Sequence, residues 1–220
     1  MHGYLADKKS FAYQYDFFER DFSVYALDFK GFGENKGMAH PYSLNDYVNE
    51  LKEFIEKNGI TYPHVIAHSF GVRVALKTLY QYPNVFDRLV FTGGAGLKPK
   101  KTFKKAVKKG AFNLLKKIVP KSRLKHFYSK DYLALNGVMK ESFKLIVNEH
   151  LDYVLPHIKN KTLLVFGDKD KETPLYMARR FNKGIVNSSL HVYKGAGHFA
   201  FIDKSNKFNM VVREFLLSKD

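Results

Sequence analysis

Hydrophobic positions along the chain fall into two patterns, short runs typical of strands and longer segments with helical spacing. The strand-like runs are residues 23–29, 64–68, 88–91, 162–166 and 190–193. The helical segments are residues 44–58, 71–82, 175–183 and 206–217. Ser43 is a suitable N-cap for the first helix, and Pro174 suits the start of the third. Strands that alternate with helices predict a parallel sheet covered by helices on both faces.

The alternation stops between about residues 96 and 161, where no strand-like run occurs. Helical spacing continues there, with an apolar stripe formed by Phe103, Val107, Gly110, Leu114 and Ile118. Because the strand and helix rhythm resumes afterwards, we interpret this stretch as a helical insertion in a single domain. The first part of the core is then 1–96, the insertion 97–160, and the second part of the core 161–220.

Length and composition favour one globular domain. The chain has 220 residues, 45% of them hydrophobic, which is enough for one buried core. It has no cysteine, which excludes a disulfide framework, a thiol nucleophile and a Cys-ligated metal. It shows no signal-peptide pattern and no run of roughly 20 apolar residues. These features predict a soluble, cytoplasmic protein.

The formal charge of +16 is concentrated in one segment. Residues 98–130 contain 13 Lys and Arg and no Asp or Glu. Two interpretations stay open: the lysines keep an exposed helix soluble, or they contact an anionic membrane surface or an anionic substrate. A nucleic-acid partner is disfavoured, because the segment has few aromatic residues and matches no known nucleic-acid module.

The strongest local motif is AHSFG at residues 67–71, where a predicted strand ends and a predicted helix begins. A serine on such a tight turn exposes its hydroxyl above the edge of the sheet, and small residues on either side let the backbone bend. The amides at the start of the helix favour negative charge at the same place. Ser69 is therefore a candidate nucleophile, and the alternative is a serine that only caps the helix.

Two further motifs follow later strands. GDKD at 167–170 comes after the strand at 162–166, and GAGHF at 195–199 comes after the strand that ends near Tyr193. Both lie past the carboxyl ends of strands, where open parallel sheets place their active sites. Each has a plainer interpretation as a turn or a helix cap. The order Ser, Asp, His nevertheless predicts a triad of Ser69, Asp168 or Asp170, and His198.

These motifs together resemble the α/β-hydrolase fold family, in its esterase and lipase-like branch with a helical cap. DFKGFG at 28–33 is similar to the family's Asp-x-x-Gly-x-Gly turn, and the motifs at 67–71, 167–174 and 195–199 resemble its nucleophile, acid and histidine turns. His2 and Gly3 resemble the His-Gly pair that helps to form its oxyanion hole.

The resemblance implies a role for each matching residue. Ser69 would be the nucleophile, His198 the general base, and Asp170, the fourth residue of Gly-x-x-Asp, the acid that orients the histidine. The backbone amides of Tyr4 and Phe70 would form the oxyanion hole. Asp168 is the competing acid.

The chain departs from the family pattern in two places. Ala67 replaces the first glycine of Gly-x-Ser-x-Gly, which adds one methyl group at the bend. His-Gly ends the third strand of the family, yet here it occupies residues 2 and 3. The resemblance therefore implies that roughly 20 to 30 N-terminal residues, enough for three strands and their turns, are missing from this sequence.

The sequence predicts a carboxylic-ester hydrolase that acts through an acyl-enzyme intermediate on a small-molecule ester. The resemblance implies that residues 97–160 form a cap over the active site. The alternatives are other serine-triad hydrolysis, of a C–C bond, thioester, lactone or amide, and a binder of nucleic acid or an anionic surface that keeps an inactive hydrolase core. We predict no cofactor and no metal, because no His-x-x-x-His pair on a helix and no phosphate-binding loop occurs.

Overall fold

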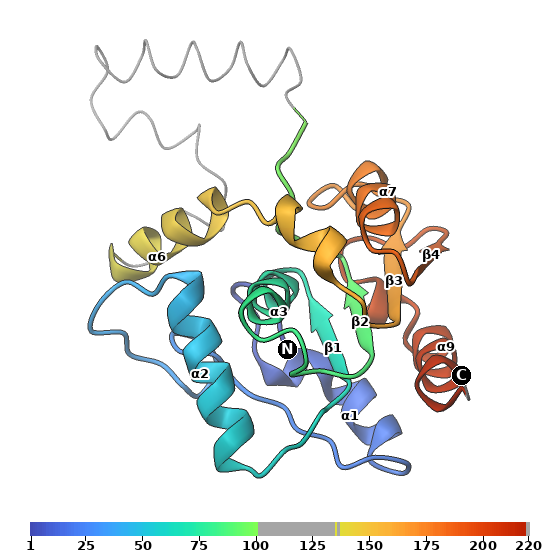
Figure 1. Ribbon diagram of the computed structural model, residues 1–220, viewed down its shortest axis with the longest axis horizontal. Coiled ribbons are helices and arrows are strands. Elements are labelled where there is room, and N and C mark those ends of the chain that lie inside the picture. Colours follow the sequence, from blue (N-terminus) through green and yellow to red (C-terminus); the bar gives the residue numbers. More distant parts are fainter. Residues whose placement is uncertain (101–134, 136, 219–220) are drawn as a thin grey trace.

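The computed structural model describes residues 1–100, 135 and 137–218 (Figure 1). Its four-stranded sheet contains β1 (Val65–His68), β2 (Leu89–Thr92), β3 (Thr162–Gly167) and β4 (Ser188–Tyr193). All pairings are parallel and the strands lie in the order β1-β2-β3-β4. The predicted parallel sheet is confirmed, with four of the five expected strands in the expected places.

One face of the sheet packs against α2 (Leu44–Lys57), α3 (Phe70–Gln81), α7 (Leu175–Gly184) and the 3-10 helix η3 (Asp152–His157). Alternate residues of a strand point to opposite faces, so every second strand residue enters this core. The buried strand residues on this side are Val65, Ala67, Leu89, Phe91, Leu164 and Phe166.

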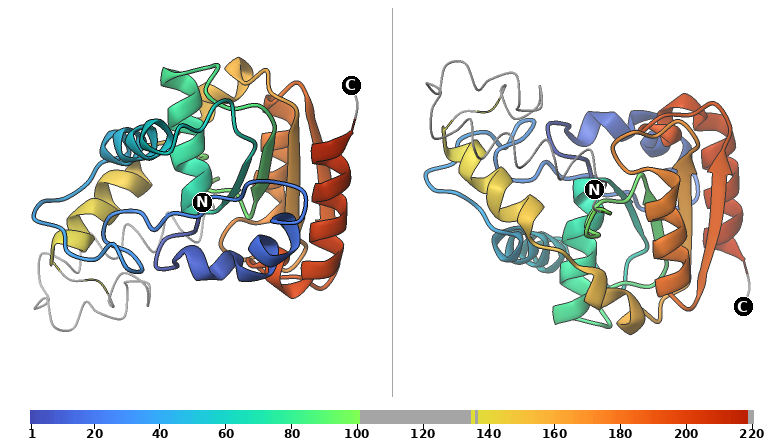
Figure 2. Two further views of the ribbon diagram at one scale, coloured as in Figure 1. Left: turned by 90° about the horizontal axis from the view of Figure 1, so that it is seen from below. Right: turned by 90° about the horizontal axis from the view of Figure 1, so that it is seen from above.

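The opposite face packs against α1 (Ala12–Phe18), α8 (Ala200–Asp203) and α9 (Ser205–Leu217) (Figure 2). The strand residues on this side are Val90, Leu163, Val165 and Tyr193. β3 is buried along its whole length, as expected for a parallel strand covered on both sides. The prediction of helices on both faces is therefore confirmed.

Helix α2 begins where the sequence predicts. Ser43 accepts a hydrogen bond from the backbone of Asp46, and the Asp46 carboxylate accepts one from the backbone of Ser43. This capping box satisfies two amides that the helix itself cannot use. The start of the helix is therefore fixed by local sequence.

The expected strand at residues 23–29 is not formed. No backbone–backbone hydrogen bond joins residues 23–28 to another part of the described chain. A cleft of about 460 Å³ separates residues 22–27 from the segment 59–66 that leads into β1. A strand needs a neighbouring strand that satisfies its backbone N–H and C=O groups. Residues 23–28 have no such partner among the described residues, because the cleft keeps them from the segment 59–66. The prediction was wrong for that reason.

The N-terminal segment reaches β1 by another route. The Met1 backbone nitrogen donates to Ile66 O at 2.7 Å, and His68 N donates to Met1 O at 3.0 Å. The 3-10 helix η1 (Lys8–Phe11) then leads into α1. Residues 1–4 consequently lie beside the end of β1 and the start of α3.

Part of the predicted insertion is described. Helix α6 (Gly137–Asn148) and η3 lie within residues 97–160. The apolar stripe and most of the lysine-rich segment 98–130 lie outside the described residues, so their predicted roles stay predictions. Among the described residues, no helix is both long enough and apolar enough to cross a bilayer.

Candidate active site

Ser69 occupies the tight turn between β1 and α3. Its backbone has φ 48° and ψ −104°, in a region that residues with a side chain seldom adopt. Such a conformation costs on the order of 1–3 kcal/mol and persists only where the surroundings impose it. The Ser69 amide donates to Thr92 O at 3.1 Å, which ties the turn to the end of β2. This strained turn places Ser69 at the carboxyl edge of the sheet.

Gly71, two residues after the serine, is required because other backbone atoms approach it closely. A Cβ atom on Gly71 would lie 2.6 Å from Met1 O and 2.9 Å from His2 O. The Gly71 amide instead donates to His2 O at 3.0 Å. Glycine at this position thus lets residues 1 and 2 pass directly over the start of α3.

His198 and Asp170 come together from the loops that follow β4 and β3. His198 Nδ1 lies 2.9 Å from Asp170 Oδ2, and the Asp170 side chain is fully buried. The other carboxylate oxygen, Oδ1, accepts the backbone amides of Glu172 and Thr173, and the Thr173 hydroxyl donates to Oδ2. Sequence reasoning missed this role of Thr173. The carboxylate is held in one orientation toward the histidine.

Asp170 stays ionised at neutral pH. Burial by itself raises the pKa of its carboxyl, but the hydrogen bond with His198, the nearby imidazole and the donors of Thr173 outweigh burial and lower the pKa overall. An ionised carboxylate can hold the Nδ1 proton of an imidazole and leave Nε2 free to accept another. That is the arrangement a general base requires.

Asp168 has a different environment. It is exposed, and its Oδ1 accepts the Gly195 amide at 2.7 Å. It therefore fastens the loop that carries His198 and makes no contact with the imidazole among the described hydrogen bonds. The geometry singles out Asp170 as the partner of His198.

His68 contacts His198 through both its ring and a hydrogen bond. Its buried ring packs against the His198 ring at 4.7 Å between centroids, and its Nε2 lies 3.1 Å from His198 O. Burial, together with nearby His198, lowers the pKa of His68 to about 3. The ring is therefore uncharged and donates its Nε2 proton to the His198 carbonyl. Sequence reasoning missed this contact, because the two residues are far apart in the chain.

Gly93 separates the serine turn from the histidine. Its backbone has φ +52°, and a Cβ atom there would lie 2.9 Å from His198 O and 3.1 Å from His198 Nδ1. The described hydrogen bonds include none between Ser69 and His198, a bond that often shortens only when substrate binds. The structure thus brings Ser69, Asp170 and His198 to the same, carboxyl edge of the sheet, and Gly93 follows β2, the strand between β1 and β3.

Gly93→Ala should lower both stability and kcat. The methyl group must displace the His198 backbone and ring, and the positive φ adds a strain of about 1–2 kcal/mol. Gly59→Ala is the matched control, because Gly59 has φ +59° but no atom within 4 Å of its would-be Cβ. Urea unfolding should show a similar backbone penalty in both variants, and kcat should fall only in Gly93→Ala. Equal kcat values in the two variants would contradict this account.

The two amides expected to form the oxyanion hole lie beside Ser69. Phe70 begins α3, and Gly3 packs so closely that a Cβ on it would lie 3.6 Å from Ser69 Cβ. Neither the Tyr4 nor the Phe70 amide donates a hydrogen bond to another described group. The Tyr4 ring packs edge-on against Phe70, and its hydroxyl donates to Met139 O of α6 at 3.1 Å. Both amides are thus available to a ligand.

Two buried histidines should make the protein labile to acid. Burial lowers the pKa of His2 from 6.5 to about 4 and that of His68 from 6.5 to about 3. The unfolded chain therefore binds protons that the folded chain excludes, and stability falls as the pH drops from 6.5 toward 4. In urea titrations at several pH values, His68→Gln, which keeps a donor near Nε2, should show a smaller fall than wild type. An identical pH dependence would contradict this assignment.

A nucleophile-type serine on a strained turn, with an Asp–His pair at neighbouring ends of a parallel sheet, defines an α/β hydrolase. A family model described as "Serine aminopeptidase, S33" matches residues 1–144, and a second, described as "TAP-like protein", matches residues 147–219. The chain belongs to the first of these families, within the α/β-hydrolase fold.

Curated relatives with similar sequences are named as hydrolases of 2-hydroxy-6-oxo dioates or of a semialdehyde. A 2-hydroxy-6-oxononadienedioate/2-hydroxy-6-oxononatrienedioate hydrolase from a Pseudomonas species is 23% identical, over 91% of this chain and 79% of the relative. The 2-hydroxymuconate semialdehyde hydrolase of Pseudomonas putida is 26% identical, over 90% of this chain and 78% of the relative.

Solved structures show the same fold. An esterase from Exiguobacterium antarcticum has a TM-score of 0.78 and 22% identity, covering 99% of this chain and 90% of that one. A meta-cleavage product hydrolase from Pseudomonas fluorescens IP01 has a TM-score of 0.74 and 23% identity, covering 98% and 88%. Within the described residues, no group of three or more His, Asp or Glu side chains could hold a metal ion.

Proposed function

We propose that the protein is a serine hydrolase that cleaves a carboxylic ester through an acyl-enzyme at Ser69. The observation that carries the proposal is the buried Asp170 carboxylate 2.9 Å from His198 Nδ1, at strand ends next to the strained Ser69 turn. This pair fixes the imidazole tautomer and leaves Nε2 as the proton acceptor.

The reaction follows from these positions. Ser69 Oγ attacks the ester carbonyl carbon while His198 Nε2 takes the hydroxyl proton, and the Tyr4 and Phe70 amides hold the negative oxygen of the tetrahedral intermediate. The carbon–oxygen bond to the alcohol then breaks, and His198 gives its proton to the departing alkoxide. Water repeats the sequence on the acyl-enzyme, releasing the acid and restoring Ser69.

Aromatic side chains support an apolar acyl group in the substrate. Tyr4 packs against Phe32 at 4.8 Å and against Phe143 of α6 at 5.2 Å between ring centroids. Helix α6 is held next to this cluster by Arg73 of α3, whose half-buried guanidinium donates to Ile146 O and Glu149 O. An apolar wall next to the predicted oxyanion hole fits a small or medium acyl chain.

A second candidate reaction is hydrolysis of a C–C bond next to a carbonyl. The curated relatives at 23% and 26% identity are named as hydrolases of keto and aldehyde carboxylates, which contain no ester bond, so their hydrolysis breaks a C–C bond. The same serine, histidine and aspartate would serve it, so the site geometry alone does not choose between the two reactions. The ester is preferred here because the aromatic wall formed by Tyr4, Phe32 and Phe143 fits an apolar acyl chain.

The proposal is tested with p-nitrophenyl esters from acetate to octanoate beside 2-hydroxymuconate semialdehyde. The expected result is ester hydrolysis with an initial burst of p-nitrophenol, unaffected by EDTA. Turnover of the semialdehyde alone would establish the C–C reaction instead. Turnover of neither, combined with steeply salt-dependent binding to nucleic acid or anionic vesicles, would favour an inactive core that binds anionic surfaces.

A further inference from the structure

Helix α6 lies beside α3, the helix that begins directly after Ser69 (Figure 2). Its residues Met139, Phe143 and Ile146 recur every three to four positions, and this face turns toward the core. Phe143 packs against the Tyr4 ring at 5.2 Å between centroids. Helix α6 therefore supplies one side of the aromatic wall next to the nucleophile.

Arg73 joins the last turn of α6 to α3. It donates to Ile146 O at 3.0 Å and to Glu149 O at 2.8 Å. The last carbonyl groups of a helix have no partner within the helix, so a cation there satisfies them and balances the negative end of the helix dipole. Arg73 lies one helical turn along α3 from Ser69. The helix that begins at the nucleophile thus also holds α6.

The charge of Arg73 depends on these carbonyl groups. The described hydrogen bonds of its guanidinium go to backbone carbonyls, whereas the Glu149 carboxylate pairs with Lys77 at 2.7 Å. Burial lowers the pKa of Arg73 to about 10, so the side chain stays charged at neutral pH. A half-buried cation that loses its acceptors is costly. Arg73 therefore favours the position of α6 in which both carbonyls are within reach.

The middle of α6 rests on the loop of residues 29–43. Ser142 is fully buried, and its Oγ accepts the Tyr42 amide at 2.8 Å. The Met139 sulfur is so near Gly31 that a Cβ on this glycine would lie 2.8 Å from it. Helix α6 is thus held between this loop and α3.

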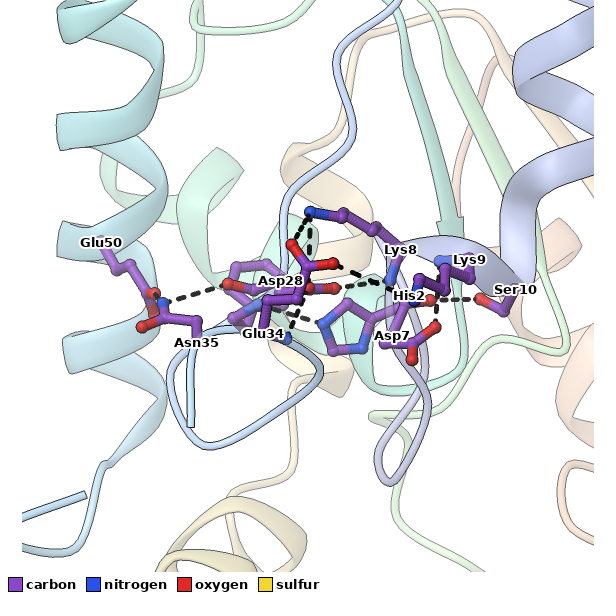
Figure 3. Close-up of polar contacts among 10 residues, drawn as sticks. His2, Asp7, Lys8, Lys9, Ser10, Asp28, Glu34, Asn35 and Glu50 are labelled. Atoms are coloured by element: carbon purple, nitrogen blue, oxygen red, sulfur yellow. Dashed lines mark hydrogen bonds and ion pairs between the residues drawn. The ribbon is translucent and has the colours of Figure 1, made fainter. Parts of the chain in front are cut away.

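Polar contacts make that loop a fixed support. The Glu50 carboxylate of α2 accepts the Lys30 amide at 2.9 Å and the Asn35 side-chain amide at 2.9 Å. Asp28 accepts the Glu34 amide at 2.9 Å. Figure 3 shows Asn35 beside Glu50 of α2, and Glu34 beside Asp28. Because the loop is fixed by these contacts, how α6 sits against α3 is decided by Arg73.

We propose that Arg73 is a specificity-determining residue: by binding the last turn of α6 to α3, it fixes the wall formed by Met139 and Phe143 and limits the length of the acyl chain. This inference rests on the proposed serine-hydrolase function. The Tyr4 ring contacts both Phe70, next to the nucleophile, and Phe143, so an acyl chain that extends along this ring reaches α6. A wall that can move then admits longer chains.

Arg73→Met keeps the apolar stem of the side chain and removes its two hydrogen bonds to α6. The ratio of kcat/KM for p-nitrophenyl octanoate to that for the acetate should rise about tenfold, the order expected when a hydrophobic pocket gains room for a methylene group. The value for the acetate should change little, because an acetyl group is too short to reach α6. Arg73→Lys keeps the charge and a donor, so its ratio should lie between those of wild type and Arg73→Met.

Arg88→Met is the matched control. Arg88 also binds the end of a helix, because its guanidinium donates to Phe215 O and Ser218 O at the end of α9, on the opposite face of the sheet. Its loss should lower the melting temperature without changing the ratio of octanoate to acetate hydrolysis. A ratio that changes equally in Arg73→Met and Arg88→Met, or in neither, would overturn the proposal.

Hydrogen exchange followed by mass spectrometry adds a readout that does not depend on catalysis. Peptides that cover α6 should exchange faster in Arg73→Met than in wild type, and at the wild-type rate in Arg88→Met. If Arg73→Met does not fold, Arg73→Lys allows the same comparison with smaller differences. Exchange in α6 that stays at the wild-type rate in the folded Arg73 variant would also overturn the proposal.

Failure of the proposed function would look different. If wild type hydrolyses none of the esters, the serine-hydrolase assignment fails, and the role of Arg73 in substrate choice fails with it. If wild type hydrolyses esters and Arg73→Met has the same chain-length profile, only the role of Arg73 fails.

Discussion

Ser69→Ala should lower kcat for p-nitrophenyl ester hydrolysis by about 10⁴- to 10⁶-fold, with KM nearly unchanged. The hydroxyl is the proposed attacking group, and alanine leaves no oxygen to form the acyl-enzyme. The fold should persist, because the Ser69 contact with Thr92 is made by the backbone amide. Initial rates and the p-nitrophenol burst measure the loss.

Ser189→Ala is the matched control for this variant. Ser189 lies exposed on the edge strand β4, away from the Asp170–His198 pair. The Ser189→Ala variant should have the same kcat as wild type. A Ser69→Ala variant that keeps more than about a tenth of wild-type kcat would remove the basis for nucleophilic catalysis by Ser69.

Asp170→Asn should lower kcat by about 10³- to 10⁴-fold while leaving the fold intact. The new amide group would donate toward His198 where the carboxylate accepts, which favours the tautomer with its proton on Nε2. Nε2 could then no longer take the serine proton. The Asn oxygen can still accept the amides of Glu172 and Thr173, so circular dichroism and the melting temperature should change little.

Asp168→Asn is the partner experiment. Asp168 accepts the Gly195 amide, and an asparagine oxygen can do the same, so kcat should stay within about fivefold of wild type. The pair of variants decides between the two acids that the sequence offers. A larger loss of kcat in Asp168→Asn than in Asp170→Asn would reverse the assignment.

The motifs at 67–71, 167–170 and 195–199 could be placed from sequence because each is a short turn at the end of an apolar run. Such turns depend on local backbone geometry, which small residues and polar residues signal directly. Helix α2 was placed for the same reason, since Ser43 and Asp46 form its capping box. Local chemistry therefore predicted most of the elements that carry the site.

Pairing between strands is a different matter. Residues 23–29 have the apolar composition of a strand, yet whether they form one depends on a neighbour that the run itself does not specify. The sequence did not predict the helices η1 and α1 either. Their apolar residues are buried by packing against α8, α9 and the sheet, and the local pattern does not reveal this packing. Patterns that depend on distant partners are poorly predicted from sequence.

The contacts that refine the site are also long-range. His68 donates to His198 O across 130 positions, and Gly93 leaves room for the His198 ring. Thr173 is local to Asp170, but a threonine before a proline is common in turns and gives no specific signal. The resemblance brought His2 to notice, whereas its bond to Gly3 O appears only in three dimensions.

The central claim is that Ser69 is a nucleophile activated by His198 and Asp170. Labelling with a fluorophosphonate probe, followed by mass spectrometry of the tryptic peptides, tests it most directly. The account predicts a single phosphonyl adduct on Ser69, lost in Ser69→Ala and formed far more slowly in Asp170→Asn. An adduct at another residue, or none on the active protein, would contradict it.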